Sequence, residues 1–330
     1  MKIVVDAMGG DHAPAVVIEG VVEALNETDA KVALVGQQDR VEEELKRYSF
    51  DRARVEVIHA DEIVEMHDPA TTPIRKKKNS SIAIGIGLLK SEQYNAFISA
   101  GNTGAVVAAS TIILGMIPGV ERPAIGLVIP TIKGFAFLID VGANTDPKPE
   151  HLLQSSLMAG VYAKEVLGRD KPRIGLLNIG EEASKGTDFV KTTHKLMTDH
   201  LPNFAGNIEP NAIFDGDFDC IICDGFAGNL VIKVSEGLME SATTVLKREI
   251  KKSPVSLLGA LLMKSRLKQL KQYADYTEYG SAPLLGVNGI VMISHGRSDA
   301  KAIKNAIKAA KREIDHNIIS RFKQEVIENQ

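Results

Sequence analysis

The sequence has no tryptophan and few aromatic residues of any kind. Aromatic side chains make 5% of its 330 residues. Uninterrupted apolar runs are also short, and none approaches the ~18 residues of a membrane-spanning helix. The net charge of −3 provides no global basic excess for nucleic acid. Neither a transmembrane protein nor a protein with a nucleic-acid partner is therefore indicated.

Cysteine is nearly absent as well. Cys220 and Cys223, in DCIICDG, are the only two. Their CxxC spacing would suit a redox or metal pair, but no second pair accompanies it, and residues i and i+3 of a strand face opposite sides. Inert core thiols in a reducing cytoplasm are the favoured interpretation, with a redox pair as the alternative. The first apolar run is too short for a signal peptide, so we expect a cytoplasmic protein.

Several common catalytic motifs are missing. The chain has no GxSxG, no HExxH and no GxGxxG after a predicted strand, and its eight histidines are scattered. GEEASKGT at 180–187 approaches a phosphate-binding P-loop, but Lys185 precedes Gly186 where that motif needs the opposite order. Nucleotide hydrolysis, zinc hydrolysis and an acyl-enzyme mechanism are therefore not favoured. A reaction that needs only positioning and charge stabilisation fits better.

Glycine, in contrast, is abundant, and its 28 residues punctuate an alternation of apolar runs and helix patterns. Such alternation predicts an α/β protein with a mostly parallel sheet and helices on both faces. The close runs at 124–130 and 135–142, around Lys133 and Gly134, predict one antiparallel hairpin. Strands are predicted at 2–7, 31–36, 54–60, 95–100, 124–130, 135–142, 173–179, 219–225 and 289–296.

Six of these predicted strands end in loops that carry glycine beside Asp, Asn, Ser, Thr, His or Lys. Ligands of open α/β sheets bind at the carboxyl ends of strands, so the loops predict a functional cleft, although plain turns also use glycine and capping residues. Glycine turns at helix N-termini suit a small anion such as phosphate. The loops are DAMGGDH (6–12), SAGNTG (99–104), DVGANTD (140–146), NIGEEASKGT (178–187), DGFAGN (224–229) and SHGRS (294–298).

These loops also carry a resemblance to a known family. DAMGGDHAP, SAGNTGA, DVGAN, NIGEEASKGT, DGFAGN and APLLGVNG followed by SHGRS occur in this order along the whole chain. In these motifs the chain resembles the bacterial phosphate acyltransferases of phospholipid synthesis. Two departures, Ser281 for a usual glycine and Pro147 for a common cysteine, affect no residue needed for chemistry.

The resemblance implies a homodimer with a three-layer α/β/α fold, similar to the phosphate acetyltransferase and isocitrate or isopropylmalate dehydrogenase folds. It implies transfer of a long-chain fatty acyl group from acyl carrier protein to inorganic phosphate, giving acyl-phosphate for phosphatidic acid synthesis. It implies no metal ion and no organic cofactor. It also makes a downstream glycerol-phosphate acyltransferase a candidate partner.

The expected site residues follow from this reaction, in which phosphate attacks a thioester. We expect Asn102, Thr103 and Gly104 to cradle the phosphate, with a plain capped turn as the alternative. Lys185 is the expected cation for the phosphate or the oxyanion, with a solvated surface lysine as the alternative. The other expected catalytic residues are Asp224, Asn229 and His295, and the other expected pocket residues are Asp6, Asp11, His12, Asp140 and Asn144. A helix cap is the alternative for Asp224, and a structural histidine for His295.

A basic segment precedes a predicted helix capped near Ser80. IRKKKNSS at 74–81 places Arg75, Lys76, Lys77 and Lys78 together in a loop. Runs of charge are usually solvated. An acyl carrier protein is strongly acidic, however, and a basic loop at the cleft would attract it. Carrier docking and a solvated surface both remain open.

An apolar segment near the C-terminal third has no acidic residue between positions 250 and 274. Its periodicity predicts two helical pieces joined by an apolar tip, with Gly259 as a candidate break. We expect a single catalytic domain over 1–330 from which this helical hairpin, at about 250–275, protrudes to contact anionic membrane peripherally, with a dimer contact as the alternative. The expected membrane-contact residues are Val255, Leu257, Leu258, Leu261 and Leu262.

Two other functions remain open on the sequence alone. A phosphotransacylase that uses short-chain acyl-coenzyme A would need the same cleft chemistry, and only the basic loop and the apolar tip argue against it. A non-catalytic membrane adaptor for acyl carrier protein would have no need of six polar strand-end loops.

Overall fold

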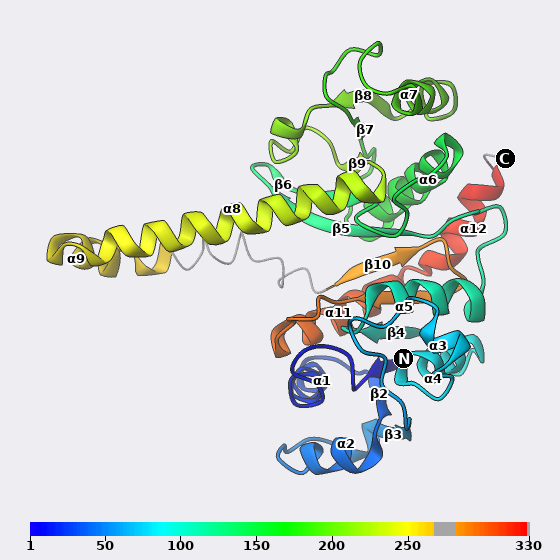
Figure 1. The fold of residues 1–330 in the computed structure, drawn as a ribbon, viewed down its shortest axis with the longest axis vertical. Coiled ribbons are helices and arrows are strands. Elements are labelled where there is room, and N and C mark those ends of the chain that lie inside the picture. Colours follow the sequence, from blue (N-terminus) through cyan, green and yellow to red (C-terminus); the bar gives the residue numbers. More distant parts are fainter. Residues whose placement is uncertain (267–280, 329–330) are drawn as a thin grey trace.

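A single eleven-stranded sheet runs through the molecule in the order β3-β2-β1-β4-β11-β10-β5-β6-β9-β7-β8 (Figure 1). The computed structural model describes residues 1–266 and 281–328. The strands are β1 (Lys2–Asp6), β2 (Lys31–Gly36), β3 (Val55–His59), β4 (Ala96–Ser99), β5 (Ala124–Thr131), β6 (Gly134–Ile139), β7 (Ile174–Leu177), β8 (Phe204–Ile208), β9 (Cys220–Ile222), β10 (Ala282–Leu285) and β11 (Ile290–Ile293).

The strands change direction only at the centre of the sheet. The ladders β11–β10, β10–β5 and β5–β6 are antiparallel, and the ladders on either side of them are parallel. β6 therefore runs against β4 along the ladder. Adjacent strands also twist by about 20–25°, so the four steps from β4 to β6 rotate the strand direction by roughly 80–100°. The twist therefore moves the two half-sheets away from the directly opposed arrangement that the reversal alone would give.

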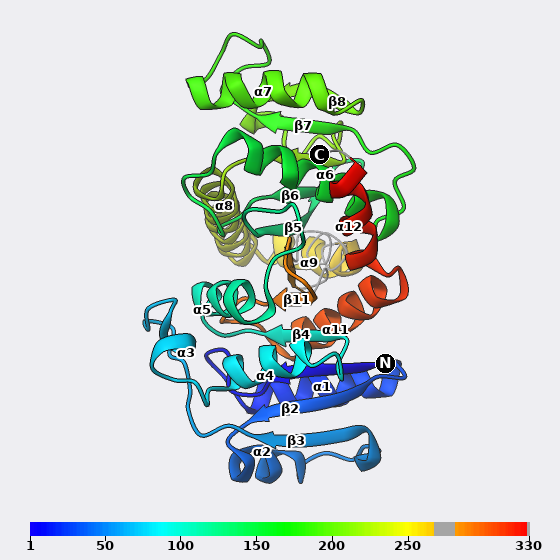
Figure 2. The same ribbon diagram turned by 90° about the vertical axis from the view of Figure 1, so that its right-hand side faces the viewer.

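Helices cover both faces of the sheet, as predicted (Figure 2). Successive side chains of β1 and β6 enter different core clusters, because strand side chains alternate between faces. One face carries α1 (Ala15–Glu27), α2 (Gln38–Leu45), α6 (Pro149–Glu165), α7 (Asp188–His200), α11 (Ala300–Asp315) and α12 (Ile318–Glu328). The other carries α4 (Ser81–Lys90), α5 (Thr103–Ala109) and the start of α8 (Gly225–Lys251), with the short α3 (Thr72–Arg75) against α4 and α5.

Short helical turns complete the described elements. The segments η1 (Arg52–Arg54) and η3 (Pro210–Ala212) are 3₁₀ turns, whereas η2 (Ser110–Leu114) is a π-helical turn that continues α5. They lie between regular elements and add no layer to the fold.

All nine predicted strands are present, and the hairpin β5–β6 pairs in register around Lys133 and Gly134. Two strands were not predicted. β8 has the sequence FAGNI, in which glycine and asparagine interrupt the apolar pattern, and it lies at the sheet edge. β10 has only four residues and contains a proline. Neither offers the run of apolar residues on which a strand prediction depends.

The helix α8 leaves the sheet and protrudes (Figure 1). Ala227, Val231 and Ile232 pack against the core, whereas most later side chains of α8 are exposed. The helix α9 (Pro254–Leu262) follows after a break at Lys252 and Ser253. The predicted break at Gly259 is therefore wrong, because proline starts a new helix at position 254 and Gly259 lies inside it. The predicted return arm of the hairpin, including 267–274, lies outside the described residues.

A buried tyrosine–glutamate pair joins the two halves on the α6–α11 face. The Tyr162 hydroxyl, on α6, donates to Glu313 Oε1, on α11, at 3.1 Å, and the Tyr162 ring stacks on Phe137 of β6 with centroids 4.4 Å apart. The Glu313 side chain is almost fully buried. Burial raises the pKa of Glu313 to about 8, against the lowering effects of Tyr162 and Arg312. The carboxyl is therefore largely protonated at neutral pH.

Replacing Glu313 by glutamine tests this buried carboxyl. Between the unfolded-state pKa of 4.5 and the folded-state pKa of about 8, only the folded state holds the proton. The free energy of unfolding of the wild type therefore falls as pH rises through this window, by about 1 kcal/mol per pH unit. Glutamine does not titrate but still accepts from Tyr162, so the variant should lack this loss. Denaturant titrations across the window measure it, and parallel pH profiles for both proteins would contradict the expectation.

Candidate active site

The loops after β1, β4 and β11 form one contact group. Asp11 N donates to Gly296 O at 2.8 Å, which ties the β1 loop to the β11 loop. Gly10 has φ +103°, and a Cβ there would lie 3.2 Å from Gly296 O and 3.4 Å from Ala100 Cβ. Only glycine adopts this backbone at such close range without strain. The predicted loops 6–12, 99–104 and 294–298 are therefore brought together.

Asp6 holds this group together from inside. Its carboxylate accepts from Ser99 Oγ at 2.7 Å and from Met8 N at 3.0 Å, and its side chain is buried. Burial raises its pKa, while hydrogen bonds from Ser81, Ser99 and the loop backbone oppose the rise. Ser99 Oγ in turn accepts from Gly101 N at 3.0 Å. The expectation that Asp6 contacts substrate stays a prediction, but the contacts described here are structural.

Asn102 caps α5, as predicted, and its side chain has further partners. Its Oδ1 accepts from Ala105 N at 3.0 Å. Its Nδ2 donates to the carbonyls of Glu65, Met66 and Asp68 at 3.1, 3.1 and 2.9 Å. Both polar atoms of this amide are thus engaged within the protein. Of the predicted phosphate cradle, Thr103 is exposed and Gly104 is half-buried, and the first backbone N–H groups of any α-helix lack a partner within the helix.

The remaining predicted residues of this group lie on its surface. Asp11, His12 and His295 are all exposed. The Nδ1 atom of His295 accepts from Arg297 N at 3.1 Å, which fixes the ring in the loop after β11. This contact makes Nδ1 the acceptor nitrogen of the neutral ring and leaves the N–H on Nε2.

The loops after β6 and β9 form a second group around Asp140. The buried Asp140 carboxylate accepts from the backbone N–H of Gly142, Ala143 and Asn144 at 3.0, 2.9 and 2.7 Å. Burial raises the pKa of Asp140, against the effect of these bonds. Asn144 O then accepts from Gly225 N at 2.7 Å. The start of α8 is thereby fastened to the loop after β6.

Asp224 caps α8, with its Oδ1 accepting from Ala227 N at 2.8 Å, as the alternative reading of this residue proposed. Asn229 is exposed one turn later, and its Cβ lies 4.0 Å from where a Cβ on Gly142 would be. Asn144 is half-buried, and its side-chain amide donates to Pro123 O. The second group therefore brings Asn229, Asn144 and Asp224 together, with Asn229 the most accessible.

Lys185 lies in the loop after β7, which two asparagines brace. Asn178 Nδ2 donates to Lys185 O at 3.2 Å, and Asn207 Nδ2 donates to Glu182 O at 3.1 Å. Both asparagines are buried, whereas the Lys185 side chain is exposed. The sequence analysis did not single out either asparagine; the signal for Asn178 was its place at the start of the NIG turn. The backbone of Lys185 is held while its ammonium stays accessible.

The two groups open on the same side of the sheet. Val141 and Ala143, in the loop after β6, pack against the core cluster that also contains Ala105 and Val106 of α5. Figure 2 shows α5 and α8, which follow β4 and β9 directly, on one side of the sheet. The loops of the two groups therefore lie on a common side of the sheet, against one core cluster.

The basic segment divides in the structure. Arg75, Lys76 and Lys78 are exposed, whereas the Lys77 ammonium pairs with Asp68 at 2.6 Å. Arg75 ends the short helix α3 rather than lying in a loop, and Ser80 caps α4, as predicted. The Lys77 side chain therefore differs from those of its neighbours, because it is half-buried and points toward Asp68.

The predicted membrane-contact residues are all exposed. On α9 the exposed fractions run from 49% for Leu257 to 79% for Val255. On α8, Phe226, Leu230, Val234 and Leu238 extend the exposed apolar surface toward the body. No helix among residues 1–266 and 281–328 is both long and apolar enough to span a membrane.

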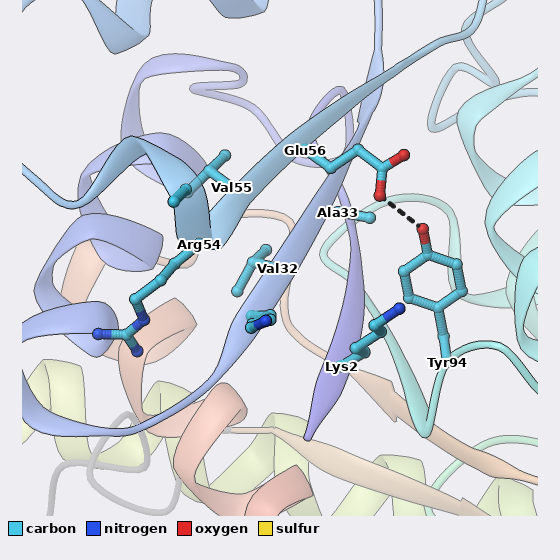
Figure 3. Close-up of a pocket in the computed structure, with 9 residues that line it drawn as sticks. Lys2, Val32, Ala33, Arg54, Val55, Glu56 and Tyr94 are labelled. Atoms are coloured by element: carbon cyan, nitrogen blue, oxygen red, sulfur yellow. Dashed lines mark hydrogen bonds between the residues drawn. The ribbon is translucent and has the colours of Figure 1, made fainter.

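Two other features lie outside the predicted site. A hollow of about 200 Å³ at the amino ends of β1–β3 contains Lys2 and a Tyr94–Glu56 hydrogen bond of 2.9 Å (Figure 3). Burial raises the pKa of Tyr94 to about 12.

Cys220 and Cys223 are buried free thiols. Burial raises the pKa of both thiols, which fits the interpretation as inert core residues. Within the described part of the chain, no cluster of three or more His, Cys, Asp or Glu could hold a metal ion.

Comparison with known proteins identifies the relationship. A family model described as "Fatty acid synthesis protein" matches residues 1–321. The chain belongs to this family. It is 46% identical over 329 residues to the phosphate acyltransferase of Geotalea uraniireducens, covering 100% of this chain and 95% of that protein. It is 45% identical over 326 residues to the phosphate acyltransferase of Alkaliphilus oremlandii, covering 99% and 97%.

The fold also resembles that of a solved enzyme. A phosphotransacetylase from Streptococcus pyogenes superposes with a TM-score of 0.61 at 19% identity, covering 94% of each chain. This likeness concerns the fold alone. The family predicted from the motifs, its class as an acyltransferase and the predicted α/β fold are therefore confirmed.

Replacing Gly228 by alanine tests the contact between α8 and the second group. A Cβ at this position would overlap Asp140 O and lie 2.9 Å from Cys223 Sγ. We expect a loss of about 1–3 kcal/mol in the free energy of unfolding, together with reduced activity, because α8 must shift. Gly237, on the same helix, has no atom within 4 Å of its would-be Cβ. Its change to alanine should stabilise by about 0.5–1 kcal/mol. Equal denaturation midpoints for the two variants would contradict this expectation.

Proposed function

We propose that the protein transfers a long-chain fatty acyl group from acyl carrier protein to inorganic phosphate and supplies the acyl-phosphate for phospholipid synthesis. The observation that carries the proposal is the relationship over the whole chain to proteins called phosphate acyltransferase. Two groups of polar, glycine-containing loops on one side of the sheet support it, since such loops suit a small anion.

The chemistry needs positioning and charge more than a strong base. A phosphate oxygen attacks the thioester carbonyl carbon, a tetrahedral oxyanion forms, the C–S bond breaks and the thiolate leaves. Inorganic phosphate is a mixture of monoanion and dianion at neutral pH, and both forms already carry a deprotonated oxygen for the attack. The first backbone N–H groups of α5, with Thr103 and Gly104, are the proposed cradle, and Asn102 shapes this turn. Orienting the phosphate and stabilising the oxyanion then account for the rate.

Residues of the other loops supply the remaining proposed roles. The exposed Lys185 ammonium offsets charge on the phosphate or the oxyanion. The Asn229 amide orients the thioester from the first turns of α8, and Asp224 holds the helix start for it. His295, in the loop after β11, is the proposed acid for the departing thiolate, and in its protonated, imidazolium form it donates the proton from Nε2. Asp11, His12 and Asn144 complete the proposed pocket.

The carrier protein is proposed to dock on the exposed cations Arg75, Lys76 and Lys78. An acidic partner would be steered toward them, and its affinity should fall with salt. Because α3 packs against α5, docking there places a carrier beside Asn102, Thr103 and Gly104, which we call the phosphate turn. The acyl-phosphate product is a reactive mixed anhydride, so a glycerol-phosphate acyltransferase is the proposed downstream partner.

The exposed apolar surface of α8 and α9 supports membrane association and a homodimer. Full burial of one leucine side chain is worth about 1.5–3 kcal/mol, and each nearby Lys or Arg adds about 1 kcal/mol at an anionic surface. Lys251, Lys252 and Lys264 flank α9. We propose that α9 rests on the membrane, while the part of α8 nearest the sheet contacts a second copy of the chain.

A direct assay tests the proposed reaction. Purified protein is incubated with phosphate and either palmitoyl-carrier protein or acetyl-coenzyme A, and acyl-phosphate is measured. Product from the carrier substrate supports the proposal. Product from acetyl-coenzyme A alone would indicate a short-chain phosphotransacylase, and no product from either would indicate a non-catalytic adaptor.

Changing Lys185 to alanine should lower turnover by well over tenfold, because one positioned charge-stabilising group is worth about 2.7–4 kcal/mol in the barrier. The melting temperature should change little, since this side chain is exposed. Lys195→Ala, which removes an exposed lysine from α7, is the control and should keep its turnover. Near-normal turnover of the Lys185 variant would remove this residue from the mechanism.

Replacing Leu258 and Leu262 together by glutamate should release the protein from anionic vesicles, because apolar contact is lost and repulsion is added. Acyl-phosphate formation from soluble carrier substrate should persist, since α9 is remote from the loops. The double variant Ile132→Glu with Ile327→Glu, at two exposed apolar positions elsewhere, is the control for vesicle sedimentation. Retained vesicle binding would contradict membrane contact, and loss of the dimer would show that α9 is a subunit contact.

A further inference from the structure

A compact network joins the basic segment to the loop that precedes it. Lys77 Nζ donates to Asp68 Oδ2 at 2.6 Å and to Ile63 O at 2.7 Å. Asp68 Oδ2 also accepts from Glu65 N at 2.9 Å. The Lys77 side chain is 29% exposed and that of Asp68 19%. Lys77 thus closes the loop 63–68 upon itself and, with its charge matched by Asp68, adds no net charge to the surface.

The same loop is held from the other side by Asn102. The three carbonyls that accept from Asn102 Nδ2 belong to Glu65, Met66 and Asp68. Asn102 Oδ1 meanwhile caps α5. Asp68 is therefore shared, because its carboxylate binds Lys77 and its carbonyl binds Asn102. A chain of direct contacts runs from the basic segment through Asp68 to the first residue of the phosphate turn.

Neighbouring contacts leave this loop little room to move independently of the turn. A Cβ on Gly104 would lie 3.2 Å from Ala70 Cβ, and a Cβ on Gly296 would lie 3.1 Å from Met66 Cε. Lys76 N and Lys77 N each donate to Thr72 O at 2.9 Å, so these hydrogen bonds also hold the backbone of the basic segment. The segment, the loop and the start of α5 therefore form one packed unit.

We propose that Lys77 and Asp68 are positioning residues that fasten the basic segment to the phosphate turn through Asn102, so that docked carrier and bound phosphate rest on one rigid unit. The proposal rests on the docking role assigned above to Arg75, Lys76 and Lys78. The proposal gives Lys77 a different role from these three residues. Arg75, Lys76 and Lys78 contact the carrier, whereas Lys77 fixes the distance between the carrier and the phosphate.

Matched single-charge variants distinguish the two roles. Lys77→Met and Asp68→Asn each break the ion pair while keeping the approximate shape, and Lys77→Arg preserves the charge. Lys76→Met removes an exposed charge of the docking set, and Lys90→Met removes an exposed lysine at the end of α4. For each variant, kcat and the KM values for phosphate and acyl donor are measured with acyl-carrier protein and with the same acyl group on coenzyme A.

Lys77→Met and Asp68→Asn should raise the KM for phosphate by about tenfold with both donors, because a slightly displaced binding turn loses affinity whichever thioester is used. Lys77→Arg should restore the wild-type value. Lys76→Met should raise only the KM for acyl-carrier protein, and Lys90→Met should change neither KM. The double variant Lys77→Met with Asp68→Asn should be no worse than either single variant, since both remove the same bond.

Hydrogen exchange supplies a readout that does not depend on activity. The amide of Glu65, which donates to Asp68, should exchange faster in Lys77→Met than in the wild type or in Lys76→Met. Unchanged exchange, or a Lys77→Met variant that raises only the KM for carrier protein as Lys76→Met does, would overturn the positioning role. An unchanged carrier KM in Lys76→Met would instead overturn the docking assignment, and with it the coupling.

Discussion

Three consecutive antiparallel ladders, β11–β10, β10–β5 and β5–β6, join two parallel half-sheets. A parallel half-sheet collects its loops at one edge, so each half has its own set of polar strand-end loops. Reversal alone would place the two sets at opposite edges. The twist between neighbouring strands, added over the central steps, turns them toward a common side. The proposed site draws on both sets, since the α5 turn and Lys185 lie in different halves.

Each half uses a buried aspartate at a strand end to organise its loops. Asp6 follows the core of β1 and binds Ser99 and the Met8 amide, while Asp140 follows β6 and binds three successive amides. Burial raises the pKa of both carboxyls, and the hydrogen bonds that they accept partly oppose this rise. Glycine occurs beside them for two reasons: a Cβ on Gly9 would lie 2.6 Å from Asp6 Oδ2, and Gly142 has φ +144°, which other residues rarely adopt. The Asp and Gly residues of the DAMGG and DVGAN motifs are therefore explained by the geometry of their loops, without reference to the reaction.

The sequence was sufficient where a local pattern determines the structure. Apolar runs gave nine strands, Asn102 and Asp224 were recognisable as caps, and Lys133 and Gly134 marked the hairpin. It was insufficient where a partner lies in an irregular loop. Lys77 looks like its neighbours in IRKKKNSS, and only the fold places Asp68 against it. The expected break at Gly259 is wrong for a different, local reason: Pro254 starts α9, and glycine is tolerated inside a short helix.

The helix α8 links the chemistry to the protruding apolar surface. It starts at the Asp224 cap beside the loop after β6 and continues for 27 residues, which corresponds to about 40 Å. Its first two turns pack on the core, and its later turns carry exposed apolar side chains as far as α9. So large an exposed apolar surface is rare on a monomer and calls for a cover. One helix therefore carries both Asn229, at the end where acyl transfer is proposed, and the exposed apolar side chains that lead to α9.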